Sequence, residues 1–208
     1  MLNYYQARNP IINPIPRPAT DTIPRFNVNI QAMAEETIVS QHPPAVSFIA
    51  PSGSGKTTLL TKLIAELKNR GYTVGAMKHG PPDFEIDRPG KDSHRLAEAG
   101  ADSMLISADN KLALVKQVEQ PPTFKELLAT YFPDVDIILV EGFKRVSLPK
   151  IEIHRHQHTS GLLCRGKKHD PNLIAVATDR ELQVDVPQLD LNQPEVIVDF
   201  LLQNFSIT

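Results

Sequence analysis

The chain has 208 residues, of which 41% are apolar, with a formal net charge of −2 and a single cysteine, Cys164. This length and composition suit one α/β core of about 150 residues plus some excess chain, and the balanced charge argues against a nucleic-acid-binding protein. One cysteine excludes an internal disulfide, and the sequence has neither an apolar run of roughly 20 residues to cross a membrane nor the apolar core of a secretory signal, so we expect a cytoplasmic protein.

The first 44 residues differ from the rest of the chain in proline content and in apolar pattern. They hold many of the 18 prolines, and no helical or alternating apolar period runs through them. Proline removes a backbone donor and disfavours helix in the residue before it. We therefore expect residues 1–44 to form a mostly disordered tail, with a partner-binding arm as the alternative. Residues 45–208 are expected to form the folded domain.

From residue 46 onward, apolar patterns predict strands that alternate with helices. Gly71 and Gly100 end two of the helices, and Thr123 with Glu126 forms a capping-box pattern. The alternation predicts an α/β fold with a mostly parallel sheet and helices on both faces. The expected strands cover residues 46–50, 73–78, 104–107, 112–118, 135–140, 151–154 and 173–177, and the expected helices cover residues 56–70, 92–99, 123–131 and 194–204.

The segment between the first strand and the first helix has the spacing of a Walker A phosphate loop, or P-loop. It reads Ala50-Pro51-Ser52-Gly53-Ser54-Gly55-Lys56-Thr57. Gly53 and Gly55 allow backbone conformations in which successive N–H groups face a bound anion. Lys56 is expected to reach the β- and γ-phosphates of a nucleoside triphosphate, and Thr57 to ligate Mg²⁺. The expected nucleotide-binding residues of this segment are Ser52, Gly53, Ser54, Gly55, Lys56, Thr57 and Thr58.

A chance glycine-rich turn is the alternative to a phosphate loop. An apolar strand precedes the motif and an amphipathic helix follows it, which is the context that a P-loop requires. The sequence therefore predicts a P-loop NTPase fold.

A second acidic position follows the apolar run that ends at Val140. Glu141 comes at the carboxyl end of this strand, where ligands of open α/β sheets lie. We expect Glu141 to hold Mg²⁺ or its water together with Thr57, and a solvated strand-end acid is the alternative. Asp136 begins the same strand and is expected to be structural, because it lies at the opposite edge.

Several short motifs follow the phosphate loop in a specific order. Lys78-His79 ends the second strand, Asp83 and Asp87 follow, and then come Gly90-Lys91-Asp92-Ser93 and Glu141-Gly142-Phe143-Lys144. In this order the chain closely resembles the molybdopterin-guanine dinucleotide biosynthesis protein B family, MobB, from about Val46 to its end. It departs from the family pattern at Ala50, which replaces the first P-loop glycine, and at Pro81-Pro82, where the family often has a histidine.

The resemblance implies a GTP-binding domain over residues 45–208, with weak GTPase activity and a homodimeric state. It also implies two partners. One is MobA, a nucleotidyltransferase that attaches GMP to molybdopterin, and the other is molybdopterin itself.

Four residues at the end of the second strand or in the region after it are candidates for contacts with the nucleotide. Asp87 is expected to orient the waters of Mg²⁺ or the water that attacks in hydrolysis, and Lys91 to pair with phosphate or with a neighbouring subunit. These two residues are the candidates for a catalytic part in hydrolysis. Lys78 and His79 emerge at a strand end near the ligand edge, where they are expected to contact phosphate. A packed, hydrogen-bonded histidine is equally compatible with the sequence at position 79.

Recognition of the nucleotide base requires a residue outside the phosphate loop. Asp179 follows a strand, and a carboxylate accepts two hydrogen bonds from guanine but finds no matching donors on adenine. The alternative is a turn aspartate. The Asn-Lys-x-Asp sequence of common guanine readers is absent, so the expectation of GTP rests mainly on the family resemblance.

Alternating histidines raise the question of a transition-metal site. His154, His156 and His158, with His169 and Cys164 nearby, are compatible with zinc or nickel, and an exposed histidine-rich strand is the commoner explanation. The basic residues of this stretch are compatible with a pterin phosphate, a partner or a solvated loop; they are Arg155, Arg165, Lys167 and Lys168.

Two other functions remain compatible with a P-loop. A small-molecule kinase usually has an arginine-rich lid, which Arg88, Lys91 and Arg95 imitate only in part. A nucleotide-gated binding module without meaningful turnover differs from the GTPase adapter only in degree. Because no residue is placed by the sequence as an arginine finger or a water-orienting glutamine, we expect slow intrinsic hydrolysis.

Overall fold

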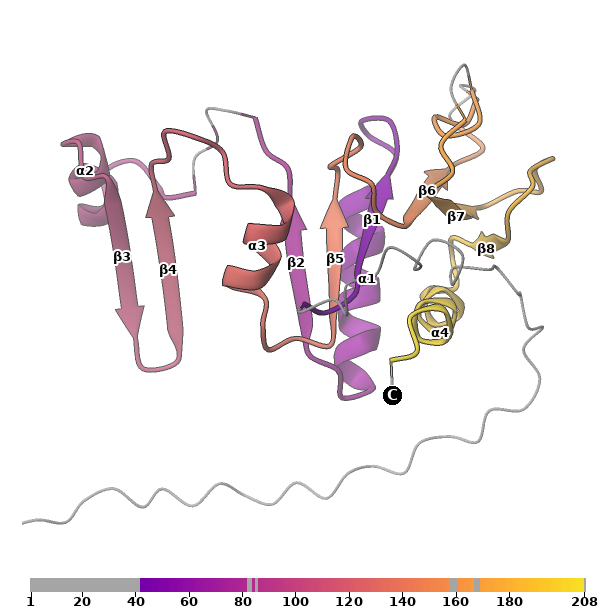
Figure 1. The fold of residues 1–208 in the computed structure, drawn as a ribbon, viewed down its shortest axis with the longest axis horizontal. Helices are drawn as coiled ribbons and strands as arrows, with labels where there is room; N and C mark the ends of the chain where they lie inside the picture. Colours follow the sequence, from indigo (N-terminus) through magenta and orange to yellow (C-terminus); the bar gives the residue numbers. More distant parts are fainter. Residues whose placement is uncertain (1–41, 82–83, 85, 158–160, 167–168, 208) are drawn as a thin grey trace, which may run out of the picture.

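The computed structural model describes residues 42–207, apart from residues 82–83, 85, 158–160 and 167–168. A six-stranded, fully parallel sheet dominates this part of the chain, with the order β2-β5-β1-β6-β7-β8. Since parallel strands point the same way, all six carboxyl ends lie at one edge of the sheet, which for β1, β2 and β5 is the upper edge in Figure 1. The strands are β1 (Ala45–Ile49), β2 (Val74–Lys78), β5 (Ile137–Glu141), β6 (Lys150–His154), β7 (Leu173–Thr178) and β8 (Gln188–Asp190).

Two helices cover one face of the sheet. They are α1 (Lys56–Asn69) and α4 (Pro194–Asn204), and their apolar stripes lie in one cluster with the side chains of β1, β5, β6 and β7. Leu63 and Leu67 of α1 and Ile197 and Leu201 of α4 are wholly buried in this cluster. Burying such side chains is worth about 1.5–3 kcal/mol each, so this face anchors the helix that follows the phosphate loop.

The opposite face is covered in two parts. The helix α3 (Phe124–Tyr131) packs over β2 and β5, with Leu128 against Ile138 and Val140. Over β1, β6 and β7 the cover is made by connecting segments, which bring Cys164 into contact with this side of the sheet. Helices therefore lie on both faces, as the sequence predicts, and the P-loop NTPase fold is confirmed.

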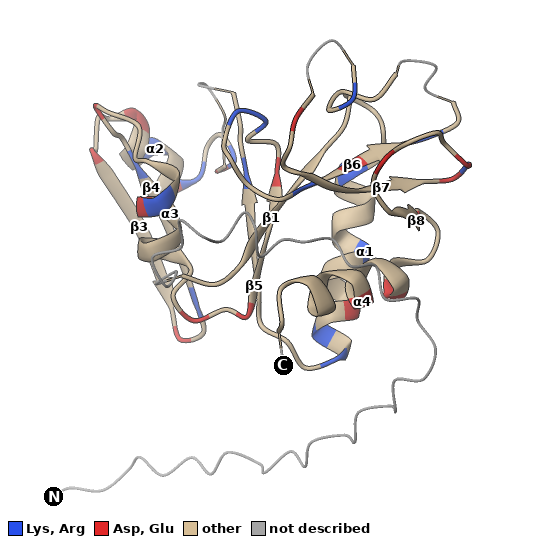
Figure 2. Ribbon diagram, turned by 45° about the vertical axis from the view of Figure 1, so that its right-hand side comes forward, with Lys and Arg blue, Asp and Glu red and all other residues tan. Residues whose placement is uncertain are grey.

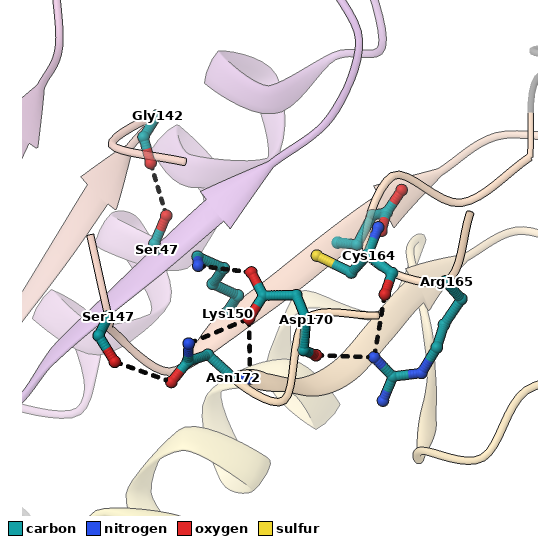
Figure 3. A network of polar contacts seen from close by, with 9 residues as sticks. Ser47, Gly142, Ser147, Lys150, Cys164, Arg165, Asp170 and Asn172 are labelled. Carbon is teal, nitrogen blue, oxygen red and sulfur yellow. Dashed lines mark hydrogen bonds and ion pairs between the residues drawn. The ribbon is translucent and has the colours of Figure 1, made fainter. Parts of the chain in front are cut away.

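The connection between β6 and β7 is held by a buried polar network (Figure 3). Lys150 is 2% exposed, and its ammonium group lies 2.6 Å from Oδ2 of Asp170. Arg165 donates to the carbonyl oxygens of Cys164 and Asp170 and forms an ion pair with Asp185. Burial and the nearby carboxylates raise the pKa of the Cys164 thiol to about 12. The charge of Arg165 is thus already paired with Asp185 within this chain. Lys167 and Lys168 lie outside the described residues.

A separate two-stranded antiparallel sheet lies apart from the main one, together with a short helix (Figure 1). It consists of β3 (Ser103–Ala108) and β4 (Lys111–Lys116), and the helix is α2 (Asp92–Glu98). Leu105 stands opposite Leu114, and Leu112 lies two residues along on the same face. These three leucines are 54%, 40% and 64% exposed, so one face of the hairpin is an uncovered apolar surface.

Most predicted elements are present within one to three residues of their expected ends, and two findings go beyond the sequence. The three-residue strand β8 was not expected, because only Leu189 of it is buried. The chain is also already part of the sheet at Pro44, whose carbonyl accepts a hydrogen bond from Ile138 at 2.8 Å. Residues 1–41 of the expected tail lie outside the described residues. No helix among residues that the structure describes is long and apolar enough to cross a membrane.

Candidate functional site

The phosphate loop connects the carboxyl end of β1 to the first turn of α1. β1 has β5 on one side and β6 on the other, so the loop lies where the two halves of the sheet meet, the usual ligand position in such folds. Gly53 and Gly55 have φ values of 77° and 79°, in the left-handed region that a residue with a Cβ rarely adopts. The Ser54 hydroxyl donates to the carbonyl of Pro51 at 2.9 Å. The loop is therefore closed by a hydrogen bond between its own residues.

Lys56 is folded back over the loop. Its ammonium group donates to the carbonyls of Ala50 at 3.2 Å and Pro51 at 2.9 Å. Burial lowers the pKa of Lys56, and the nearby cations of Lys144 and Lys78 lower it further, against an opposing effect of Glu141. A bound polyanion would relieve this repulsion. Ser52 and Thr58 are exposed at the beginning and the end of the same segment.

The two residues expected to hold a metal ion lie side by side. The Thr57 hydroxyl donates to Oε2 of Glu141 at 3.1 Å, and the ammonium of Lys78 lies 3.5 Å from Oε1 of the same carboxylate. Parallel pairing explains the second contact, because Lys78 and Glu141 are partners in the register of β2 and β5. Hydroxyl and carboxylate oxygens are ligands that suit Mg²⁺, which keeps several waters and draws further ligands from substrate phosphates.

His79 lies at the same edge, beside the turn that follows Glu141. Its backbone N–H donates to the carbonyl of Glu141 at 3.0 Å, and its ring stands 4.9 Å from that of Phe143. Phe143 in turn meets Phe124 of α3 edge-on at 5.2 Å. The exposed imidazole is thus packed on an aromatic ring. Figure 2 shows basic segments at this end of the sheet, next to the acidic end of β5.

Arg155 is a residue of this site that the sequence placed only in a general basic stretch. It follows β6 directly, and its Nε donates to the carbonyl of Ser54 in the phosphate loop at 3.0 Å. β6 is paired with β1, so the ends of these strands bring the side chain and the loop together. The one signal available in the sequence was an arginine directly after a predicted strand.

Asp179 lies at the carboxyl end of β7. Two residues, His156 and Arg155, connect it to the phosphate loop. The Oδ1 atom of Asp179 accepts a hydrogen bond from the backbone N–H of His156 at 2.7 Å, and His156 follows Arg155 in the chain. An open pocket of about 400 Å³ adjoins this carboxylate. The residues that line it are Thr178, Asp179, Arg180, Glu181, Gln188, Leu189, Asp190 and Asn192.

Asp87 and Lys91 lie next to α2. Hydrogen bonds from the Ser93 side chain and the Arg88 backbone lower the pKa of the Asp87 carboxyl, and the N–H of Lys91 donates to the carbonyl of Arg88 at 3.3 Å. Among the residues that the structure describes, no hydrogen bond or ion pair joins either side chain to the phosphate loop. Their expected part in hydrolysis stays a prediction.

The histidines after β6 do not share one environment. His154 is buried at the end of β6, while His156 is exposed and approaches Arg180. Within the described ranges, no three histidine, cysteine, aspartate or glutamate side chains are grouped as a metal site would require. His158 lies outside those ranges.

The chain is similar to known proteins of one family. The family model for molybdopterin guanine dinucleotide synthesis protein B, MobB, matches residues 45–179. The chain is 38% identical over 160 residues to the molybdopterin-guanine dinucleotide biosynthesis adapter protein of Haemophilus influenzae, covering 76% of this chain and 87% of that protein. It is 37% identical over 174 residues to the adapter protein of Escherichia coli, covering 82% and 96%.

Solved structures are similar as well. The crystal structure of Bacillus subtilis MobB gives a TM-score of 0.62 at 26% sequence identity, covering 78% of this chain and 98% of that one. A MobB homologue from Bacillus stearothermophilus gives 0.56 at 24% identity, which supports the fold alone. Because the family model spans residues 45–179 and two relatives exceed 30% identity over most of their own length, this chain belongs to the MobB family.

Proposed function

We propose that this protein is a GTP-binding adapter in the synthesis of molybdopterin-guanine dinucleotide, with weak GTPase activity. The observation that carries the proposal is the closed phosphate loop with the Thr57 hydroxyl 3.1 Å from the Glu141 carboxylate. The relatives in Haemophilus influenzae and Escherichia coli are named as adapter proteins of this synthesis. We infer that the partners are a MobA-type guanylyltransferase and molybdopterin.

Phosphate binding would use groups that are already in place. The first turn of α1 begins at Gly55 without a side-chain cap, so its N–H groups and the positive end of the helix are available to an anion. Lys56 would exchange its two carbonyl contacts for the β- and γ-phosphates. Mg²⁺, when bound, neutralises phosphate charge, and Thr57 and Glu141 would hold it or its waters.

Base recognition is assigned to Asp179 and its pocket. The carboxylate lies at the ligand edge of the sheet, and its Oδ1 is held by the N–H of His156. Each carboxylate oxygen accepts more than one hydrogen bond, so both oxygens can still take donors from the guanine edge. Adenine has no matching pair of donors on that edge, so the proposal is GTP over ATP.

Slow turnover by the lone protein follows from what phosphoryl transfer requires. A positive charge at the γ-phosphate and a water held in line are worth about 10³ to 10⁵ in rate. Asp87 and Lys91, the candidates from the sequence, hydrogen-bond within the segment before α2. We infer that nucleotide binding serves mainly to order surfaces that meet the transferase.

A homodimer is part of the proposal, and the β3–β4 hairpin is its interface. An isolated two-stranded hairpin is marginally stable in water, and the apolar face of this one, formed by Leu105, Leu112 and Leu114, is open to solvent. A second copy of the same hairpin offers a matching apolar face in a two-fold arrangement. Pairing the two faces would shield both sheets.

A steady-state assay tests the adapter function. GTP hydrolysis would be measured for the purified protein, with and without the transferase, alongside the Lys56→Ala variant. We expect turnover far below the usual enzyme range of roughly 1 to 10³ per second, and loss of support for dinucleotide synthesis in the variant. Rapid turnover by the lone protein, or phosphate transfer to a small acceptor, would instead favour a self-sufficient enzyme such as a kinase.

A further inference from the structure

The Arg155 side chain reaches from the end of β6 onto the outside of the phosphate loop. Its Nε lies 3.0 Å from the carbonyl oxygen of Ser54. Two guanidinium nitrogens would stand 3.2 Å from a Cβ added to Gly55, so the cation is packed against the Ser54–Gly55 peptide itself. The residue is half-buried there.

The contact with Ser54 has a consequence for the next N–H. In a planar trans peptide, the carbonyl and the N–H of the following residue point in opposite directions. A Ser54 carbonyl that is held against Arg155 therefore turns the Gly55 N–H away from Arg155. Within the described residues this N–H has no hydrogen-bond acceptor, while the Gly55 carbonyl accepts the first helical bond, from Leu59 at 3.0 Å.

We infer that Arg155 is a positioning residue of the phosphate loop, which holds the Ser54–Gly55 peptide with the Gly55 N–H directed at a bound phosphate. The inference rests on the proposed nucleotide binding and adds a residue to it. Arg155 acts through the loop and not by contact with the reacting atoms. Its charge also lies next to the anion site, where it strengthens the local positive field.

The backbone that carries Arg155 is itself fixed. The N–H of His156 donates to Oδ1 of Asp179 at 2.7 Å, and the strands β6 and β7 pair up to His154 and Thr178. The Arg155–His156 segment thus connects the phosphate loop to the carboxylate proposed as the base reader. An arginine on a fixed backbone holds a peptide group more firmly than one on a mobile loop.

The test compares Arg155→Met, which keeps an unbranched apolar side chain and removes the hydrogen-bond donors, with Arg155→Lys, which restores a cationic donor group. Arg95→Met is the matched control, since it removes the same charge from α2, away from the phosphate loop. Two probes of the phosphate site are used, inorganic tripolyphosphate and Mg–GTP, by calorimetric titration. A third measurement follows the Gly55 amide resonance in the ligand-free, ¹⁵N-labelled protein.

Arg155→Met is expected to lower the affinity for both probes by about 10-fold, because it removes a charge-assisted hydrogen bond. It is also expected to move the Gly55 resonance. Arg155→Lys should recover most of the affinity, and Arg95→Met should change neither measurement. Unchanged affinity with an unmoved Gly55 resonance would overturn the inference. So would a fall in melting temperature with widespread resonance changes and no selective effect at Gly55, because that pattern marks a general structural contact.

The proposed function and this inference fail in distinguishable ways. A wild-type protein that binds tripolyphosphate but does not prefer GTP contradicts the base assignment and leaves the role of Arg155 to be decided by the variants. A wild-type protein that binds neither probe contradicts nucleotide binding. In that case the inferred phosphate role of Arg155 falls with it, even if the Gly55 resonance shows that Arg155 holds the loop.

Discussion

The Thr57 hydroxyl donates a hydrogen bond to Oε2 of Glu141 over 3.1 Å, although the two residues are 84 positions apart in the chain. Thr57 lies in the first turn of α1, and Glu141 ends β5, which is paired with β1. The parallel sheet therefore brings a hydroxyl and a carboxylate to one point of its upper edge. This relationship is the basis of the first prediction.

Removing either partner should weaken magnesium-dependent nucleotide binding without unfolding the chain. We expect Glu141→Ala and Thr57→Val each to lower the affinity for Mg–GTP by about 10-fold or more, since each removes an oxygen ligand of the cation or its waters. Thr57→Ser is the matched control, because it keeps the hydroxyl. The measurement is a titration of each variant with GTP, with and without Mg²⁺. If the GTP affinity of Glu141→Ala depends on Mg²⁺ as strongly as that of the unaltered protein, Glu141 does not help to hold the cation.

Two substitutions at Asp179 separate base reading from its structural contact. Asp179→Asn keeps an oxygen that accepts from the His156 N–H but loses the second carboxylate oxygen, so it should narrow the preference for GTP over ATP by about 10-fold. Asp179→Ala also removes the hydrogen bond to the His156 N–H, which holds the backbone beside Arg155. It should therefore lower the affinity for both GTP and ATP. Equal affinity of the unaltered protein for GTP and ATP would contradict the base assignment.

A charge on the hairpin should break the proposed dimer. Leu112 is 64% exposed on the apolar face, so Leu112→Lys costs little in the monomer but places a like charge beside its copy across a two-fold interface. We expect the mass measured by light scattering to fall from that of a dimer to that of a monomer. Lys111→Glu, on the neighbouring position, serves as the control, and a wild type that is already monomeric at high concentration would rule the interface out.

Deletion of the proline-rich segment should leave the domain intact, provided the cut respects the sheet. A chain that starts at residue 42 keeps the hydrogen bond between Ile138 and the Pro44 carbonyl and should retain GTP affinity and melting temperature. A chain that starts at residue 46 loses that bond and part of β1, and should be less stable. A large fall in melting temperature for the first deletion would show that the segment packs on the domain or across a dimer.

The single cysteine should be slow to react in the folded protein. Burial raises the pKa of the Cys164 thiol to about 12, so almost no thiolate is present at pH 8, and only the thiolate attacks an alkylating reagent. We expect iodoacetamide to label Cys164 at pH 8 only after unfolding, as followed by mass spectrometry. Rapid labelling of the folded protein would mean that the β6–β7 connection opens readily.

The patterns that are local in sequence were sufficient for most of the elements. The apolar runs of β1, β5 and β7 predict buried strands, since such strands must be covered on both faces, and Thr123 with Glu126 forms the predicted capping box in the structure. The spacing of the phosphate loop is also local, because its glycines and Lys56 act within one turn. Fold class and family followed from these features.

Thr57 and Glu141 were already expected from the sequence to lie together, and the structure places them 3.1 Å apart. The other contacts between distant residues of the site were decided by the tertiary structure alone. The contact of Arg155 with Ser54 and that of Asp179 with His156 depend on strand order and register, and a one-residue shift in register would point these side chains elsewhere. The exposure of Leu105, Leu112 and Leu114 could not be predicted from the sequence either. An alternating apolar pattern is the same whether that face is covered by the same chain or left open to solvent. Sequence patterns record what each segment prefers, whereas contacts across the sheet depend on how all the segments pack together.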